Sequence, residues 1–166
     1  MAQQRRATFQ EVLLAIKARL VACGFLSNQI AYLATNAIPD FIGDTSIYIR
    51  PRGMRSVHSG GFRYSKVVTR LVDIIVKITS AADESGNDLQ YLTDDEESIF
   101  VTEDRVLDAL EAEVMFDANR NALTTTALQL IQDSDPEKNR RPHLGDVWMT
   151  FEVQYQPILT LPRINV

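Results

Sequence analysis

The stretch that decides the fold is SKVVTRLVDIIVKITS, residues 65–80. Its β-branched residues place apolar side chains on one side at a period of two, which predicts a half-buried β-strand. The apolar side holds Val68, Val72, Ile74, Val76 and Ile78, and the mostly polar side holds Thr69, Asp73, Lys77 and Thr79. Sixteen residues of strand reach roughly 50 Å, whereas a domain of this length is about 40 Å wide. We therefore expect the strand either to bend at a bulge or to project as one side of a hairpin arm.

An amphipathic helix is predicted before this strand, over residues 9–23. Thr8 suits the N-cap position, and Glu11 three residues later completes a capping box. Gly24 suits the left-handed position that ends a helix. The apolar neighbours of Cys23 predict a buried structural thiol.

The remaining elements complete an α+β pattern. A second helix is expected over residues 103–118 with Thr102 as its cap, and strands over 46–50 and 146–155. Residues 123–131 fit a strand or a helix, and their threonines favour the strand. The predicted fold is a mostly antiparallel sheet of about four strands, with two helices on one face and a long β-hairpin arm.

One domain is expected to include all 166 residues. Three segments of it are predicted to lack regular structure. They are a mobile glycine-containing loop at 53–64, an acidic loop at 81–98 and an extended C-terminal tail at 156–166.

Composition argues against several functional classes. A single cysteine and two histidines exclude an intramolecular disulfide and disfavour a tetrahedral zinc site. No stretch reaches the roughly 20 apolar residues that span a bilayer, and the cysteine usage suits an intracellular setting. The nucleophile elbow, phosphate loop, dinucleotide and zinc-protease motifs are all absent. We therefore expect neither an enzyme nor a bound cofactor or metal ion.

Charge is unevenly distributed along the chain, although its net value is only −5. Residues 45–80 hold seven basic side chains against one acid, a net +6, while residues 81–119 hold thirteen acids against one arginine, a net −12. This separation of charge along the chain predicts two surfaces of opposite sign. Such surfaces steer proteins toward one another. The predicted interface residues are Arg50, Arg52, Arg55, Arg63, Lys66 and Arg70, with Trp148 and Tyr155 as apolar anchors.

The order of elements resembles that of the tail-terminator and neck proteins of long-tailed bacteriophages. The resemblance rests on the capped first helix, the strand that ends in Ile49-Arg50-Pro51-Arg52, the glycine loop, the β-branched strand, the second helix and the closing strand with Trp148. It implies a virion structural protein, assembled in the host cytoplasm, that forms a homo-oligomeric ring of typically six subunits. Such a ring ends the tail tube, joins it to the head connector and lets DNA pass without specific binding.

Three alternatives stay open from the sequence. The first is a head–tail connector or stopper of the same neck, which differs in its partners and not in its local chemistry. The second is a small adaptor that binds nucleic acid through the basic surface Arg50–Arg70, where aromatic residues are interleaved. The third is an enzyme that uses His58 or the acidic loop, although no carboxylate near His58 in the sequence would orient it.

Overall fold

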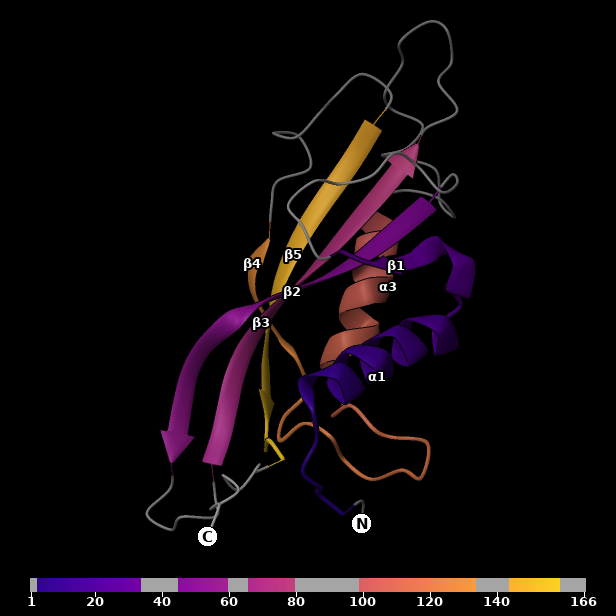
Figure 1. The fold of residues 1–166 in the computed structure, drawn as a ribbon. Coiled ribbons are helices and arrows are strands. Elements are labelled where there is room, and N and C mark those ends of the chain that lie inside the picture. Colours follow the sequence, from indigo (N-terminus) through magenta and orange to yellow (C-terminus); the bar gives the residue numbers. More distant parts are fainter. Residues whose placement is uncertain (1–2, 34–44, 60–65, 80–98, 134–143, 159–166) are drawn as a thin grey trace, which may run out of the picture.

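The structure, a computed structural model, describes residues 3–33, 45–59, 66–79, 99–133 and 144–158. Its elements are α1 (Phe9–Ala22), a 3-10 turn η1 (Ser27–Gln29), β1 (Ile30–Tyr32), β2 (Thr45–Ser59), β3 (Lys66–Thr79), α3 (Ile99–Glu111), β4 (Gln129–Asp133) and β5 (Leu144–Tyr155). The five strands form one mixed sheet in the order β1-β2-β3-β5-β4. Figure 1 shows both helices beside the diagonal strands of the sheet. The predicted α+β class is confirmed. The described sheet has one strand more than expected, because β1 adds a short parallel edge to β2.

The β-branched strand β3 lies at the centre of the sheet, with β2 on one side and β5 on the other, both antiparallel. The side predicted to be apolar packs against both helices and forms the main core. Its sheet residues include Val68, Val72, Ile74 and Val76 of β3, Ile47 and Ile49 of β2, and Val147, Met149, Phe151 and Val153 of β5. The helices contribute Val12, Ile16 and Leu20 from α1 and Val106 and Leu110 from α3.

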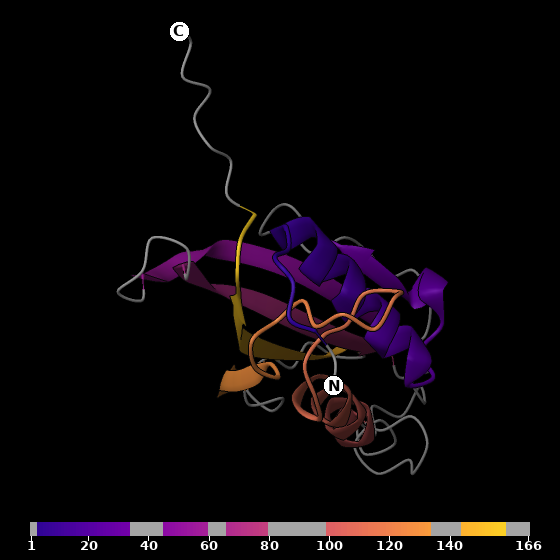
Figure 2. The same ribbon diagram turned by 90° about the horizontal axis from the view of Figure 1, so that it is seen from below.

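The predicted arm is present, and its first strand is longer than expected. Strand β2 continues to Ser59, so the expected loop is wrong for residues 53–59, whereas residues 60–64 lie outside the described part. Register shifts between Pro51 and Met54 and between Met54 and Ser56 absorb the irregular residues, and pairing with β3 then resumes. A glycine within a strand is compatible with such a bulge. Figure 2 shows β2 and β3 extending together beyond the helices.

Helix α1 begins as the sequence predicts. The Thr8 hydroxyl accepts a hydrogen bond from the Glu11 backbone N–H, and the Glu11 carboxylate accepts one from the Thr8 N–H at 2.7 Å. The helix ends at Ala22, and Gly24 follows the C-cap Cys23 with a φ of +101°, which L side chains rarely adopt. Cys23 is exposed at the C-cap, so the predicted burial of its thiol is wrong.

Helix α3 is displaced toward the N-terminus from its predicted range. It begins at Ile99, so Thr102 lies buried inside it, and it ends at Glu111. The early end has a physical cause, because the next residues pair with a later segment and not with the helix. Met115 donates its N–H to the Thr124 hydroxyl and accepts a hydrogen bond from the Leu123 N–H at 2.7 Å.

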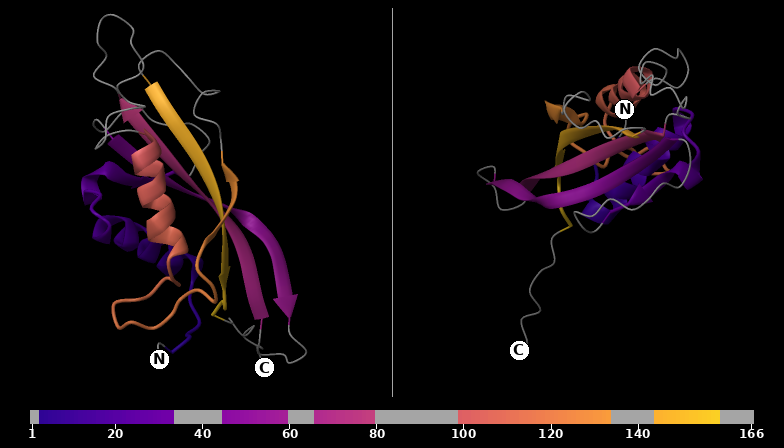
Figure 3. Two further views of the ribbon diagram at one scale, coloured as in Figure 1. Left: turned by 180° about the vertical axis from the view of Figure 1, so that it is seen from behind. Right: turned by 90° about the horizontal axis from the view of Figure 1, so that it is seen from above.

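Edge strands close the sheet on both sides. Residues 129–133 form β4 beside β5, so the strand interpretation of residues 123–131 is confirmed only for their end. Figure 3 shows β4 alongside β5 from two further directions. The acidic segment 81–98 and residues 159–166 of the predicted tail lie outside the described residues. Among the residues described, no helix is long and apolar enough to cross a membrane.

Candidate interaction surfaces

A buried carboxylate occupies the centre of the sheet face opposite the main core. Arg50 of β2, Asp73 of β3 and Thr150 of β5 are neighbours in one row across the three strands. Arg50 Nε donates to Asp73 Oδ2 at 2.9 Å and its Nη2 contacts the same oxygen, while the Thr150 hydroxyl donates to Oδ1 at 2.8 Å. Asp73 is only 1% exposed. Its charge is therefore balanced inside the sheet and is not presented to solvent.

An apolar cluster adjoins this charged row. Leu33, Tyr48 and Ile75 are buried together, and the half-buried Trp148 packs against them. The Arg50 guanidinium lies 4.7 Å from the centre of the Trp148 ring, which favours a cation–π contact. The predicted anchor Trp148 is thus partly accessible. The other predicted anchor, Tyr155, stacks on Phe9 at 5.8 Å and is 3% exposed, so it packs within the subunit.

The structure divides the predicted basic residues between two faces of the sheet. Arg50 and Arg52 both approach Asp73, the latter at 3.8 Å, whereas Arg70 projects from the opposite face and lies 4.7 Å from the Phe9 ring. Lys66 is exposed on the arm. The side chain of Arg55 is not described, and Arg63 lies outside the described residues. Of the side chains that the structure describes, Arg50 and Arg70 thus do not share one surface, as the nucleic-acid alternative requires.

An acidic surface is present on α3. Asp104, Asp108 and Glu111 are exposed at helical spacing, and we call these three residues the acidic face of α3. Phe100, 44% exposed, lies one turn before Asp104. The neighbouring Glu103 is buried, and its carboxyl has a pKa raised to about 8. Burial is the main cause of this increase, and a hydrogen bond with Asp133 is the second. Glu103 is consequently neutral near pH 7 and does not add to the acidic face.

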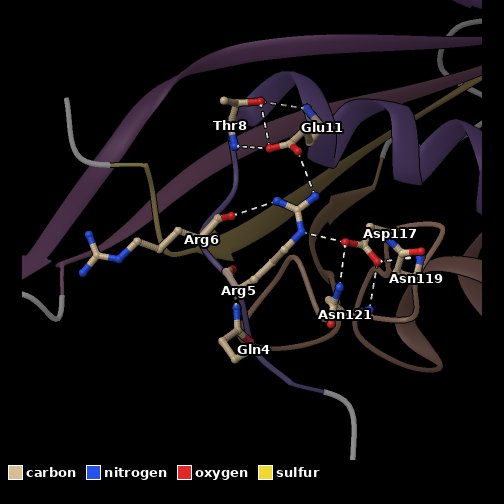
Figure 4. Close-up of polar contacts among 8 residues, drawn as sticks. All are labelled: Gln4, Arg5, Arg6, Thr8, Glu11, Asp117, Asn119 and Asn121. Carbon is tan, nitrogen blue, oxygen red and sulfur yellow. Dashed lines mark hydrogen bonds and ion pairs between the residues drawn. The ribbon is translucent and has the colours of Figure 1, made fainter.

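A third group of polar contacts fixes the N-terminal segment (Figure 4). Arg5 Nη2 donates to Glu11 Oε1 at 2.8 Å and its Nε donates to Asp117 Oδ2 at 2.7 Å. The pKa of Asp117 is lowered to about 2, mainly by the hydrogen bond from the Asn121 backbone N–H and secondly by the one from Arg5. The Arg5 guanidinium likewise holds the pKa of Glu11 below its usual value. Both carboxylates are occupied by Arg5, so the arrangement suits an internal clamp and not a site for a cation.

Two hollows flank Leu14 on the outer side of α1. The first, of about 310 Å³, is lined by Gln10, Leu13, Leu14, Tyr32, Leu33 and Pro51. The second, of about 290 Å³, lies between α1 and residues 116–123, next to the Arg5 clamp. Such volumes are at or below the lower end of the roughly 300–1,000 Å³ typical of small-molecule sites. The first hollow is almost entirely apolar in its lining residues, which favours a peptide or protein side chain over a charged ligand.

The described residues hold no group of three or more histidine, cysteine, aspartate or glutamate side chains that could bind a metal ion. His58 lies in β2 opposite Val67, with its side chain undescribed. Sequence reasoning missed the Asp73 row and the Arg5 clamp. An acid in the middle of a β-branched run is a signal for the first, whereas the partners of Arg5 are up to 112 residues away and give no local signal.

Comparison with known proteins gives no family. No protein-family model and no curated protein sequence matches the chain. One solved structure, without a stated function, is 14% identical over 92% of this chain and 99% of its own, with a TM-score of 0.44. Another is the sheath/tube terminator of the PVC extracellular contractile injection system, which is 18% identical over 98% of this chain and 64% of its own, with a TM-score of 0.38. Both TM-scores are below 0.5, so these likenesses establish neither a shared fold nor a shared role.

Proposed function

We propose that this chain is a structural virion protein that forms a ring at the neck end of a phage-type tail. In that role the ring ends the tail tube and joins it to the head connector, and DNA passes through it without specific binding. The observation that carries the proposal is the position of two surfaces of opposite charge on different parts of one subunit. These are the acidic face of α3 and the basic arm, which we define as the paired strands β2 and β3 with the exposed side chain of Arg52 at its base and that of Lys66 at its end.

The separation of these surfaces suits a closed ring. A ring of identical subunits needs head-to-tail contacts, in which one patch of a subunit meets a different patch of the next. The arm projects beyond both helices, whereas α3 lies beside the opposite half of the sheet (Figure 1). The arm of one subunit can therefore reach α3 of its neighbour without the two patches meeting in the same subunit.

Charge sets the register of this contact, and apolar contact supplies most of its free energy. An exposed ion pair contributes about 0–1 kcal/mol, although complementary potentials raise the association rate and exclude wrong orientations. Exposed apolar side chains are available beside the acidic face, where Phe100 is 44% exposed and Ile131 of β4 is 45% exposed. Burying the exposed part of both side chains against a neighbour would contribute about 1–3 kcal/mol in total, because full burial of one such side chain contributes about 1.5–3 kcal/mol and less than half of each is exposed.

A charge-swap experiment tests the proposal. One variant carries Arg52→Glu and Lys66→Glu, and the other carries Asp104→Lys and Asp108→Lys. Each variant alone is expected to have a lower mass than wild type by light scattering, because like charges then face each other in every contact. A 1:1 mixture should recover the wild-type mass, because each mutated arm now meets a mutated helix, and alternation closes in a ring of six.

Two results would contradict the proposal. Variants that each keep the wild-type oligomeric mass would show that these surfaces do not meet. A mixture that stays dissociated, while both variants remain folded by circular dichroism, would show that the contact is not arm to helix. Electron microscopy of the mixture distinguishes closed rings from open chains.

A further inference from the structure

Apolar side chains stand exposed around the first hollow beside α1. Of the residues that line it, Leu14 is 53% exposed and Tyr32 is 41% exposed. The exposed surface continues along α1 through Ala18 and Val21, while the opposite side of the helix is buried in the core. Exposed apolar surface around a hollow is typical of protein–protein contact sites. The hollow is therefore a candidate site for an apolar side chain of another molecule.

Two basic side chains lie next to the lining residues. Lys17 Nζ is 5.6 Å from the centre of the Tyr32 ring. Arg52 directly follows a lining residue of β2, and its side chain is 48% exposed. The nearest acid on α1, Glu11, is paired with Arg5 and does not offset these charges. An apolar side chain with acids beside it therefore suits this hollow better than one without them.

Phe100 at the start of α3 combines these two properties. It is 44% exposed, and Asp104 and Asp108 of the acidic face follow it after one and two helical turns. The exposed residues Leu26 and Ile158 have no acid within four positions in the sequence. Their side chains therefore offer the apolar surface without the charge.

Ile131 of β4, which is 45% exposed, is also less suited than Phe100. Asp133, on the same strand, is hydrogen-bonded to Glu103 inside the subunit, so its charge is already engaged. Aromatic rings also bury more apolar surface on contact than aliphatic side chains do. A cavity of about 150 Å³ is enough to hold benzene, and the hollow measures about 310 Å³, so the ring of Phe100 fits within it.

The hollow is not filled by Phe100 of the same subunit. Arg105 of α3 donates a hydrogen bond to the Cys23 carbonyl at the C-terminal end of α1, at 3.0 Å. The hollow begins at the other end of α1, where Gln10 to Leu14 line it, about 14–20 Å along the helix from Cys23. Phe100 is not among the lining residues. Each subunit therefore has an exposed Phe100 and an open hollow on different parts of its surface.

We propose that Phe100 of one subunit enters the hollow beside α1 of the next, with Asp104 and Asp108 facing Lys17 and Arg52. This inference rests on the proposed ring, because it names the apolar anchor of the contact between the acidic face of α3 and the basic arm. The hollow adjoins the base of that arm, where Arg52 lies. Two different patches meet in every contact, which is the head-to-tail arrangement that a ring needs.

Single-cysteine variants test this contact directly. In a Cys23→Ser background, one variant carries Phe100→Cys, and a second carries Leu14→Cys or Gln10→Cys, at positions that line the hollow. A disulfide needs Cα atoms within about 7 Å. Mild oxidation of a 1:1 mixture, read by intact mass, should link the two variants at least about tenfold more than it links either variant to itself. In the matched control Leu26→Cys replaces the hollow variant, because Leu26 is 61% exposed but does not line the hollow.

Removal of the ring provides a second measurement that needs no cysteine. Phe100→Ala should raise the protein concentration at which the oligomer is half dissociated by about threefold or more, because the exposed part of the ring is no longer buried in each contact. Leu26→Ala, the matched control, should leave that concentration unchanged. Analytical ultracentrifugation measures the dissociation, and circular dichroism should show that both variants are folded, since both side chains are exposed.

The outcomes separate this contact from the ring itself. Mixed disulfides no more frequent than in the control, or a Phe100→Ala variant that dissociates like Leu26→Ala, would overturn the inference. If closed rings still form and the charge-swap mixture still recovers its mass, only the inference fails and the proposed function stands. Selective disulfides within open chains, seen by electron microscopy, would support the inference and contradict the closed ring.

Discussion

Replacing Asp73 by alanine is the most informative test of what holds the sheet together. The carboxylate of Asp73 is 1% exposed and receives hydrogen bonds from Arg50 and Thr150, and Arg52 lies 3.8 Å away. Alanine removes the negative charge but leaves the Arg50 guanidinium, whose side chain is only 14% exposed, in the same place. The folded state then holds a positive charge at the sheet centre without the carboxylate that balances it.

The expected cost follows from that imbalance. Removing one partner of a buried ion pair costs about 3–5 kcal/mol, mostly because the remaining charge is desolvated and unpaired. The lower end, about 3 kcal/mol, is appropriate here because Arg50 also contacts the Trp148 ring and is not fully buried. The double variant Arg50→Met, Asp73→Leu removes both charges. Its stability should lie within about 1 kcal/mol of wild type or exceed it, as apolar replacements of buried ion pairs often do.

Urea unfolding followed by circular dichroism measures both effects through the midpoint and the slope. The double-mutant cycle completes the test, with Arg50→Met and Asp73→Leu as its two single variants. The decisive quantity is the coupling free energy, which should be about 2 kcal/mol or more. The reasoning is refuted if Asp73→Ala costs less than about 1 kcal/mol, or if the double variant loses the sum of the two single losses.

Three smaller predictions concern single sites, each measured by urea unfolding. The unfolded chain releases the Glu103 proton near pH 4.5, whereas the folded state keeps it to about pH 8, so the free energy of unfolding should fall as the pH rises between these values. Glu103→Gln should remove more than about 1 kcal/mol of that fall. Parallel pH profiles of the variant and the wild type would contradict this prediction. Gly24→Ala should cost about 1–3 kcal/mol, because φ is +101° and a Cβ would approach Arg105 Nη2 to 2.8 Å. Thr8→Ala should cost about 1 kcal/mol through the lost capping box, and Thr8→Ser, which keeps the hydroxyl, serves as the control.

Local chemistry made much of the fold predictable. The first helix follows from Thr8, Glu11 and Gly24, because capping and helix termination depend on residues within a few positions of one another. The central strand follows from its β-branched period-two pattern in the same way. Its length also required either a bulge in that strand or an arm, and the structure has the arm, whereas the register shifts lie in the partner strand β2.

Features that depend on distant partners were not predictable. The end of α3 is decided by Met115, which pairs with residues 123 and 124 and not with the helix. The extension of β2 through Gly53 depends on pairing with β3, which outweighs the local preference of the glycine for a turn. The charged surface was overestimated for a related reason. Counting arginines gives a net charge, but only the strand register shows that Arg50 faces Asp73 and that Arg70 faces Phe9.

The charged side chains that a neighbouring molecule could contact lie at the edges of the protein and not at the centre of the sheet. Opposite the helices, Arg50 and Arg52 both contact Asp73, and the basic surface left to a partner on that face is the solvent-facing part of Arg52. Lys66, four residues before Arg70 in β3, is exposed on the other face at the end of the arm. On α3, the buried Glu103 is neutral near pH 7 and the charge is concentrated on the outer residues Asp104 and Asp108. In both places the charge available to a neighbour lies at the periphery of the protein, where the free-energy cost of desolvating it on contact is small. A ring built from such contacts would be strongly directed yet weakened by salt, and its stability would depend on the apolar side chains beside them.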